Sequence, residues 1–109
     1  MPNYSRNDVL LVRYPFTDLS GAKLRPAVVV NAPHLSQDSF VVPLTSRLAV
    51  LQAGEFVLTD WEKAGLNVPT AVKRGVYTIH PSLIAKFIGH LSAQDSQSLE
   101  KSLQEWLGL

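Results

Sequence analysis

Cysteine is absent from the sequence. Its absence excludes disulfide bonds and zinc sites built from thiolates. The three histidines, His34, His80 and His90, lie far apart and lack the spacing of metal ligands. A Gly-rich phosphate loop, a His-Glu-x-x-His helix and a nucleophile elbow are missing as well. We therefore expect no metal site and no cofactor.

Long hydrophobic runs are also missing. The longest apolar runs, such as Pro26–Val30, cover only five residues, whereas a membrane-spanning helix needs about 20. The first residues, Met1–Asn7, are polar, and no signal-peptide apolar stretch follows them. These absences predict a soluble protein that stays in the cytoplasm.

The sequence has almost no excess of charge of either sign. Lys and Arg number 10 and Asp and Glu number 9, which gives a net charge of +1. A strongly basic protein would point directly to nucleic acid. If this chain binds RNA, it must use a local basic patch.

What is present fits one compact domain over residues 1–109, because 46% of the residues are hydrophobic. Short β-forming runs separated by turn residues predict strands at Asp8–Tyr14, Arg25–Asn31, Ser39–Thr45, Glu55–Thr59, Thr70–Ile79 and Lys86–Leu91. The apolar Val28–Val30 indicate a central strand, whereas Pro43 indicates an edge or a bulge. A loop is expected at Phe16–Lys23, and single helical turns are expected at Asp60–Gly65 and before Lys86.

The C-terminal segment has the pattern of an amphipathic helix. Ser92 and Asp95 form a variant capping box, and Gly108 stops the helix. Apolar residues recur on one face at Leu99, Leu103, Trp106 and Leu107. The expected fold class is therefore mainly β (α+β), a small curved sheet or barrel with a C-terminal helix that packs on it.

Two segments carry residues suited to phosphate chemistry. Arg25 precedes Pro26 at the start of an apolar strand, and Pro43–Arg47 ends a strand with two hydroxyls and a cation. An Arg beside a Thr or Ser can clamp a phosphate and stabilise developing charge. By pattern alone, Arg25 is more often a solvated residue at a strand end. Thr45 and Ser46 are ordinary turn formers, and Lys73 is most simply part of a solvated edge.

The same segments, in this order, resemble the MazF/PemK-like toxins of type II toxin–antitoxin systems. Asp8–Asp18 is similar to the family segment GDVVLVPFPFTD, Leu24–Val30 to RRPALVL, and Val42–Ser46 to VPITS. Later blocks follow in the family's order and cover nearly the whole chain: Ala64–Leu66, Pro69, Val72–Lys73, Thr78–Ile79 and Ile88–Ser92.

The resemblance implies an SH3-like β-barrel of five to seven strands with a C-terminal α-helix. It implies a homodimer that cleaves single-stranded RNA without a metal, leaves a 2′,3′-cyclic phosphate and is neutralised by a cognate antitoxin. The family's catalytic arginine and threonine correspond to Arg25 and Thr45. Ser46, Arg47, Lys73 and Thr17 are the expected RNA-binding residues, and the loop Phe16–Leu24 is expected to cover the site.

Three positions depart from the family pattern. Asn7 replaces a glycine, and Tyr77 and His80 stand where some relatives have an arginine and an acidic residue. The general base is therefore not identified. His80 is a possible general acid or base, because histidine exchanges protons near neutral pH.

Other functions stay open at this point. SH3-like barrels also serve as binding modules, and toxins of the same fold act on DNA gyrase instead of RNA. A degenerate relative that only binds its antitoxin is a third hypothesis. Nuclease activity requires Arg25 and Thr45 in one groove, whereas a binding module does not.

Overall fold

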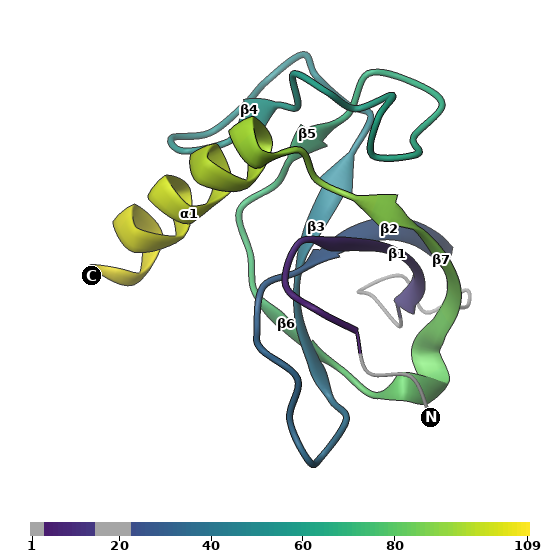
Figure 1. Cartoon of the computed structure of the whole chain (residues 1–109). Coiled ribbons are helices and arrows are strands. Elements are labelled where there is room, and N and C mark those ends of the chain that lie inside the picture. Colours follow the sequence, from purple (N-terminus) through teal and green to yellow (C-terminus); the bar gives the residue numbers. More distant parts are fainter. Residues whose placement is uncertain (1–3, 15–22) are drawn as a thin grey trace.

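The computed structural model describes residues 4–14 and 23–109, so most of the expected Phe16–Leu24 loop, including Thr17, lies outside the described residues (Figure 1). Within them, the chain forms seven strands, a 3₁₀ helix and an α-helix. Their bounds are β1 (Asp8–Tyr14), β2 (Lys23–Val29), β3 (Ser39–Thr45), β4 (Phe56–Val57), β5 (Ala71–Val72), β6 (Tyr77–Ile79), η1 (Pro81–Leu83), β7 (Ile84–His90) and α1 (Ala93–Leu107).

The strands form one antiparallel sheet in the order β4-β5-β3-β2-β1-β7, and β6 also pairs with β3. The sheet curls around itself (Figure 1), but no pairing in the described residues joins β4 to β7. The prediction of a mainly β fold with a C-terminal helix is confirmed, and the expected barrel is an open, strongly curved sheet.

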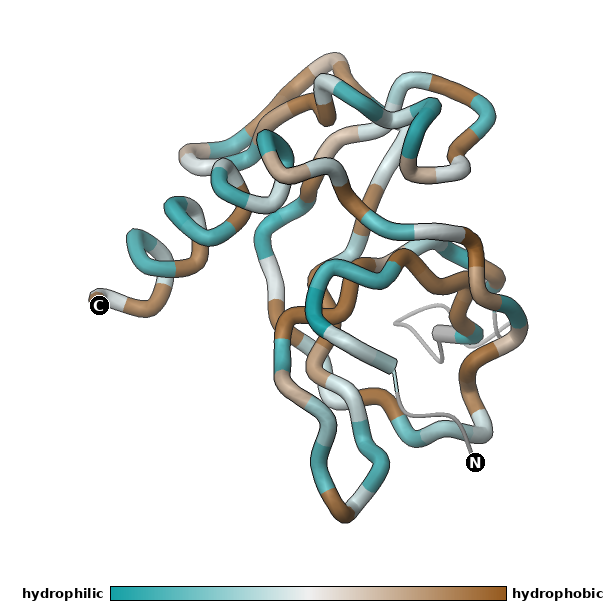
Figure 2. The backbone as a smooth tube through the Cα atoms, in the orientation of Figure 1, coloured by the Kyte–Doolittle hydropathy of each residue, from teal (hydrophilic) through white to brown (hydrophobic). Residues whose placement is uncertain are grey.

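The central position of β2 is confirmed by burial on both faces. Val28 packs into one core cluster with Val9 and Val42, and Val29 packs into a second cluster with Leu10. All five side chains are inaccessible to solvent. Figure 2 shows hydrophobic residues concentrated along these strands and mostly hydrophilic residues along α1. The alternation of side chains along a strand explains why one apolar run fills two cores.

Pro43 does not lie on an edge, and this part of the prediction is wrong. Strand β3 has β2 on one side and both β6 and β5 on the other. Its Ser39–Val41 stretch pairs with β6, and its last two residues pair with β5. Pro43 lies at the changeover between them, where a residue without an N–H is tolerated. Its carbonyl accepts a hydrogen bond from the Lys73 N–H at 2.9 Å.

Elsewhere, the predicted boundaries need adjustment. The single strand expected at Thr70–Ile79 is two strands, β5 and β6, with Gly75 in the break between them. The helical turn followed by a strand near the C-terminus is confirmed as η1 and β7. The turn at Asp60–Gly65 has an α-helical hydrogen bond from the Ala64 N–H to the Asp60 carbonyl at 3.1 Å. It also has a 3₁₀-type bond from the Gly65 N–H to the Glu62 carbonyl at 3.0 Å, and Gly65 ends it at φ 94°.

Helix α1 begins and ends as predicted, but Asp95 has a different role. Ser92 Oγ accepts the Asp95 N–H at 3.2 Å, and Gly108 ends the helix at φ 71°. The Asp95 carboxylate is 1% exposed and accepts the N–H groups of Thr59 and Asp60, each at 2.9 Å. The helix start is therefore tied to the segment that follows β4.

The apolar face of α1 is narrower than predicted. Leu99 is buried in the core, Leu103 and Trp106 are partly buried, and Leu107 is exposed. Near the C-terminus of the helix, the Trp106 Nε1–H donates to the Ala53 carbonyl at 2.9 Å. The helix thus covers the β4 end of the sheet and the loop before it.

Candidate active site

The register of β2 and β3 brings the two predicted catalytic residues together. Ala27 pairs with Pro43 and Val28 with Val42 in an antiparallel ladder. Continuing this register by two residues places Arg25 across from Thr45. Lys23 lies two residues before Arg25, so side-chain alternation places it on the same face.

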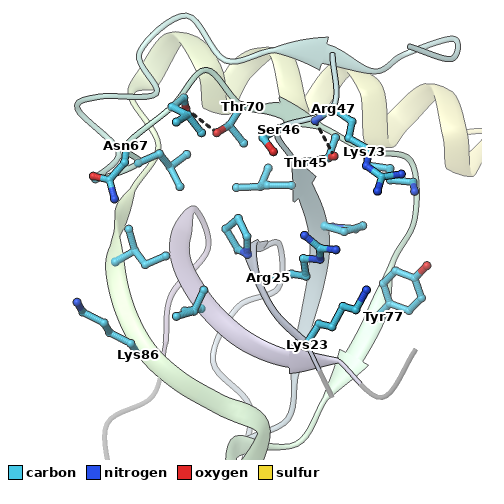
Figure 3. A pocket seen from close by; sticks show the side chains of 18 residues that line it. Lys23, Arg25, Thr45, Ser46, Arg47, Asn67, Thr70, Lys73, Tyr77 and Lys86 are labelled. Atoms are coloured by element: carbon cyan, nitrogen blue, oxygen red, sulfur yellow. Dashed lines mark hydrogen bonds between the residues drawn. The ribbon is translucent and has the colours of Figure 1, made fainter. Parts of the chain in front are cut away.

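A cleft of about 790 Å³ opens over this position. Strands β1, β2, β3, β6 and β7 contribute to it, together with residues between 65 and 73 (Figure 3). Its polar lining residues are Lys23, Arg25, Thr45, Ser46, Arg47, Asn67, Thr70, Lys73, Tyr77 and Lys86. Four of the predicted site residues that the sequence placed in two separate segments, Arg25, Thr45, Ser46 and Arg47, therefore share one cleft with Lys73.

The residues that line the cleft have a much higher net positive charge than the whole chain. Five of the ten Lys and Arg residues line it, and no Asp or Glu from the described residues does. Within that part of the chain, the guanidinium groups of Arg25 and Arg47 and the ammonium of Lys73 form no ion pair. Figure 3 shows these three side chains on one side of the cleft. Such a concentration of cations attracts an anionic ligand. The net charge of +1 does not reveal this local positive potential.

Thr45 has a hydroxyl with a defined orientation. It ends β3, is partly buried, and its Oγ1 accepts the Arg47 N–H at 3.1 Å (Figure 3). Because this bond uses Oγ1 as the acceptor, the hydroxyl hydrogen is left for a ligand. Thr70, in contrast, donates its hydroxyl hydrogen to the Val68 carbonyl at 2.8 Å. Thr45 is therefore the better placed hydroxyl donor of the two.

The wall formed by residues 65–70 rests on two close backbone approaches. A Cβ on Gly89 of β7 would lie 2.4 Å from the Ala64 carbonyl oxygen, and one on Gly65 would lie 2.7 Å from the Ile88 carbonyl oxygen. Glycine at both positions lets the turn pack directly against β7. This contact fixes the wall opposite the cationic side.

His80 does not line the cleft. It is exposed and caps the N-terminus of η1, where its Nδ1 accepts the Ser82 N–H at 3.1 Å. It follows Ile79, which pairs with Ser39 at the far end of β3. Thr45 lies six positions further along β3 than Ser39, which is roughly 20 Å along the strand. The role of His80 as an acid or base stays a prediction that its position does not favour.

The described residues contain no group of three His, Cys, Asp or Glu side chains close enough to hold a metal ion. His34 and His90 are exposed and lie outside the cleft lining. None of the helices in this part of the chain is both long enough and apolar enough to span a membrane.

Sequence reasoning missed several lining residues, among them Lys23, Asn67, Tyr77 and Lys86. Strand alternation relative to Arg25 was a signal that could have found Lys23. Lys86 had no comparable signal, because its place depends on the pairing of β7 with Leu11 of β1. Asn67 depends on the packing of the turn against β7.

The arrangement suits a phosphodiester. Guanidinium groups form charge-assisted and bidentate hydrogen bonds with phosphate oxygens. A hydroxyl donor beside them can stabilise charge that develops on those oxygens. The uncharged wall leaves room for the less polar part of a nucleotide.

Comparison with known proteins gives a consistent picture. Residues 5–107 match the family described as PemK-like, MazF-like toxin of type II toxin-antitoxin system. The structure is similar to MazF from Deinococcus radiodurans, with a TM-score of 0.78 and 18% identity over 100% of both chains. The Mycobacterium tuberculosis toxin MazF-mt6 has a TM-score of 0.72 and 24% identity, over 94% of this chain and 97% of that chain.

A third similar structure is an endoribonuclease from a mycobacterial species in complex with its cognate antitoxin. Its TM-score is 0.75 at 17% identity, over 100% of this chain and 97% of that chain. A search of curated proteins found no significant match. At these identities the structural matches establish the fold.

Proposed function

The chain belongs to the family of PemK-like and MazF-like toxins of type II toxin–antitoxin systems, and from this premise we propose that it is an endoribonuclease that cleaves single-stranded RNA. One observation carries the proposal: Arg25 and Thr45 line the same cleft, and the charged side chains of the described residues around them are all cations. The structurally similar endoribonucleases support it.

The proposed reaction is an internal transesterification. The ribose 2′-oxygen attacks the adjacent phosphorus and loses its proton, the bond from phosphorus to the 5′-oxygen breaks, and the leaving 5′-oxygen gains a proton. The products are a 2′,3′-cyclic phosphate and a 5′-hydroxyl. Negative charge on the non-bridging oxygens increases in the transition state, so the catalyst must stabilise it.

Arg25 and Thr45 are the proposed catalytic residues. The Arg25 guanidinium would contact the non-bridging oxygens, and the Thr45 hydroxyl would donate to the same phosphate. Ser46, Arg47 and Lys73 would bind this phosphate or its neighbours, since all three line the cleft. Thr17 keeps its expected RNA-binding role as a prediction. The proton acceptor for the 2′-hydroxyl is not assigned by the proposal.

Partners follow from the family. We expect a homodimer, with RNA bound along the groove between its subunits. Light scattering on the purified protein would detect the dimer as twice the 12.0 kDa mass of one chain.

We also expect a cognate antitoxin, as in the mycobacterial complex. A segment of the antitoxin rich in acidic residues would fit the cationic cleft and block RNA. Messenger RNA as the substrate would place the protein in the cytoplasm.

A direct test is to incubate the purified protein with a long single-stranded RNA in EDTA. The proposal predicts cleavage and cyclic phosphate ends, because Arg25 and Thr45 supply the charge stabilisation without a metal. Arg25→Ala should lower the rate about 100- to 1,000-fold. Arg13→Ala is the matched control, since Arg13 is exposed on the neighbouring strand and does not line the cleft.

The opposite result would favour a different function. If the wild-type protein cleaves none of many RNA sequences, the fold serves as a binding module or as a gyrase-type toxin. If Arg25→Ala and Thr45→Ala both cleave normally, the protein is a nuclease but the catalytic assignment is wrong.

A further inference from the structure

Tyr77 is the only aromatic side chain that lines the cleft among the residues that the structure describes. It begins β6 and is 41% exposed. Figure 3 shows its ring on the cationic side of the cleft, beside Lys23 and below Lys73. A large apolar ring is thus presented to solvent next to groups suited to phosphate.

The ring is also held in place from one side. A Cβ built on Gly75 would lie 3.1 Å from Tyr77 Cε2 and 3.5 Å from Cζ. The ring therefore packs against the Gly75 backbone, in the break between β5 and β6, where a larger residue would crowd it. Because the ring is already positioned, little conformational entropy is lost when a ligand binds to it.

We propose that Tyr77 is a stacking platform for an unpaired nucleobase of the RNA, next to the phosphate that Arg25 and Lys73 contact. Single-stranded RNA is recognised by stacking splayed bases on aromatic side chains while cations follow the backbone. The cationic side of the cleft has both an aromatic ring and cations (Figure 3). This inference rests on the proposed RNA-binding function of the cleft and adds a residue that selects for single-stranded over paired RNA.

Binding of a short, uncleavable RNA tests the inference separately from catalysis. The probes are a 2′-O-methyl oligoadenylate, which lacks the free 2′-hydroxyl, and a chain of equal length in which every nucleotide is abasic. Both carry the same phosphates, so their difference in affinity reports on the bases. The wild-type protein should bind the oligoadenylate about 5- to 150-fold more tightly.

Three variants identify the residue responsible. Tyr77→Leu should remove most of the preference for the oligoadenylate, whereas Tyr77→Phe should keep it because the ring remains. Phe40→Leu is the matched control, since Phe40 is an exposed aromatic residue of β3, 48% exposed, that does not line the cleft. Its preference should equal that of the wild type.

The outcomes separate the two claims. If the wild-type protein binds neither probe, both the RNA-binding function and the role of Tyr77 are wrong. If it binds both probes equally, or if Tyr77→Leu keeps the preference, the role of Tyr77 alone is wrong. If RNA is not cleaved but Tyr77→Leu loses the preference, the stacking role stands and the catalytic proposal fails.

Discussion

Among single residues, Thr45 is partly buried at the end of β3, and its hydroxyl oxygen accepts a hydrogen bond from the Arg47 N–H. We expect Thr45→Ser to cleave RNA within a few-fold of the wild-type rate, because the hydroxyl is kept. Thr45→Val has nearly the same shape but no donor, so its kcat should fall by about two orders of magnitude. Single-turnover cleavage measures both, and equal rates for the two variants would remove Thr45 from the reaction.

His80 provides the complementary case. Its Nδ1 contacts Ser82 at the start of η1, and its side chain lies outside the cleft lining. We expect His80→Ala to keep the wild-type cleavage rate and to lose about 1 kcal/mol of stability with the cap. Steady-state cleavage and urea unfolding measure the two effects. A large loss of kcat with unchanged stability would make His80 an acid or base after all.

The sequence pointed to Arg25 and Thr45 only through the order of several family-like segments. By itself, Arg25 was more typical of a solvated strand end, and Thr45 was an ordinary turn former. Their common cleft depends on the register of β2 and β3, which local pattern does not encode. Tyr77 had appeared only as a departure from the family pattern, and its place in the cleft required the pairing of β6 with β3.

At the scale of secondary structure elements, Asp95 joins α1 to the segment after β4. Its buried carboxylate accepts two backbone N–H groups, from Thr59 and Asp60. Asp95→Ala would leave both donors without a partner, and each costs about 1–3 kcal/mol. We expect a loss of roughly 2–6 kcal/mol in the free energy of unfolding, measured by urea denaturation.

Ser92→Ala is a useful control for Asp95. It removes only the cap of the same helix and should cost about 1 kcal/mol. If Asp95→Ala costs no more than Ser92→Ala, the two long-range hydrogen bonds contribute nothing measurable.

Elements with strong local patterns were predicted best. β1 and β3 have the predicted bounds, and α1 begins after its predicted cap. The errors arise where pairing with a segment distant in the sequence determines the local structure. β5 and β6 divide one apparent strand because β3 pairs with each of them over a different stretch. Asp95 fits the local pattern of a capping box, yet its carboxylate accepts hydrogen bonds from residues that are 35 and 36 positions away.

For the whole molecule, the main feature is the uneven distribution of a nearly balanced charge. Five cations line the cleft, while the net charge is +1. RNA binding should therefore weaken steeply with salt, because bound phosphates release counterions. Lys73→Gln should reduce the slope of log affinity against log salt by about 0.7, the value for one charge on a single strand.

Lys63→Gln is the matched control for the salt measurement. Lys63 is exposed, lies 4.0 Å from Asp60 and does not line the cleft. Its slope should equal that of the wild type. Equal slopes for all three proteins would mean that Lys73 binds no phosphate.

A double-mutant cycle on Arg25 and Thr45 tests the shared phosphate site most directly. Cleavage rates of one defined single-stranded RNA are compared for the wild type, Arg25→Ala, Thr45→Ala and the double variant. If both side chains stabilise one phosphate, Thr45→Ala should cost much less in the Arg25→Ala background than alone, with a coupling energy of about 0.5–3 kcal/mol. Wild-type rates for both single variants, or purely multiplicative losses, would contradict the site described for this cleft.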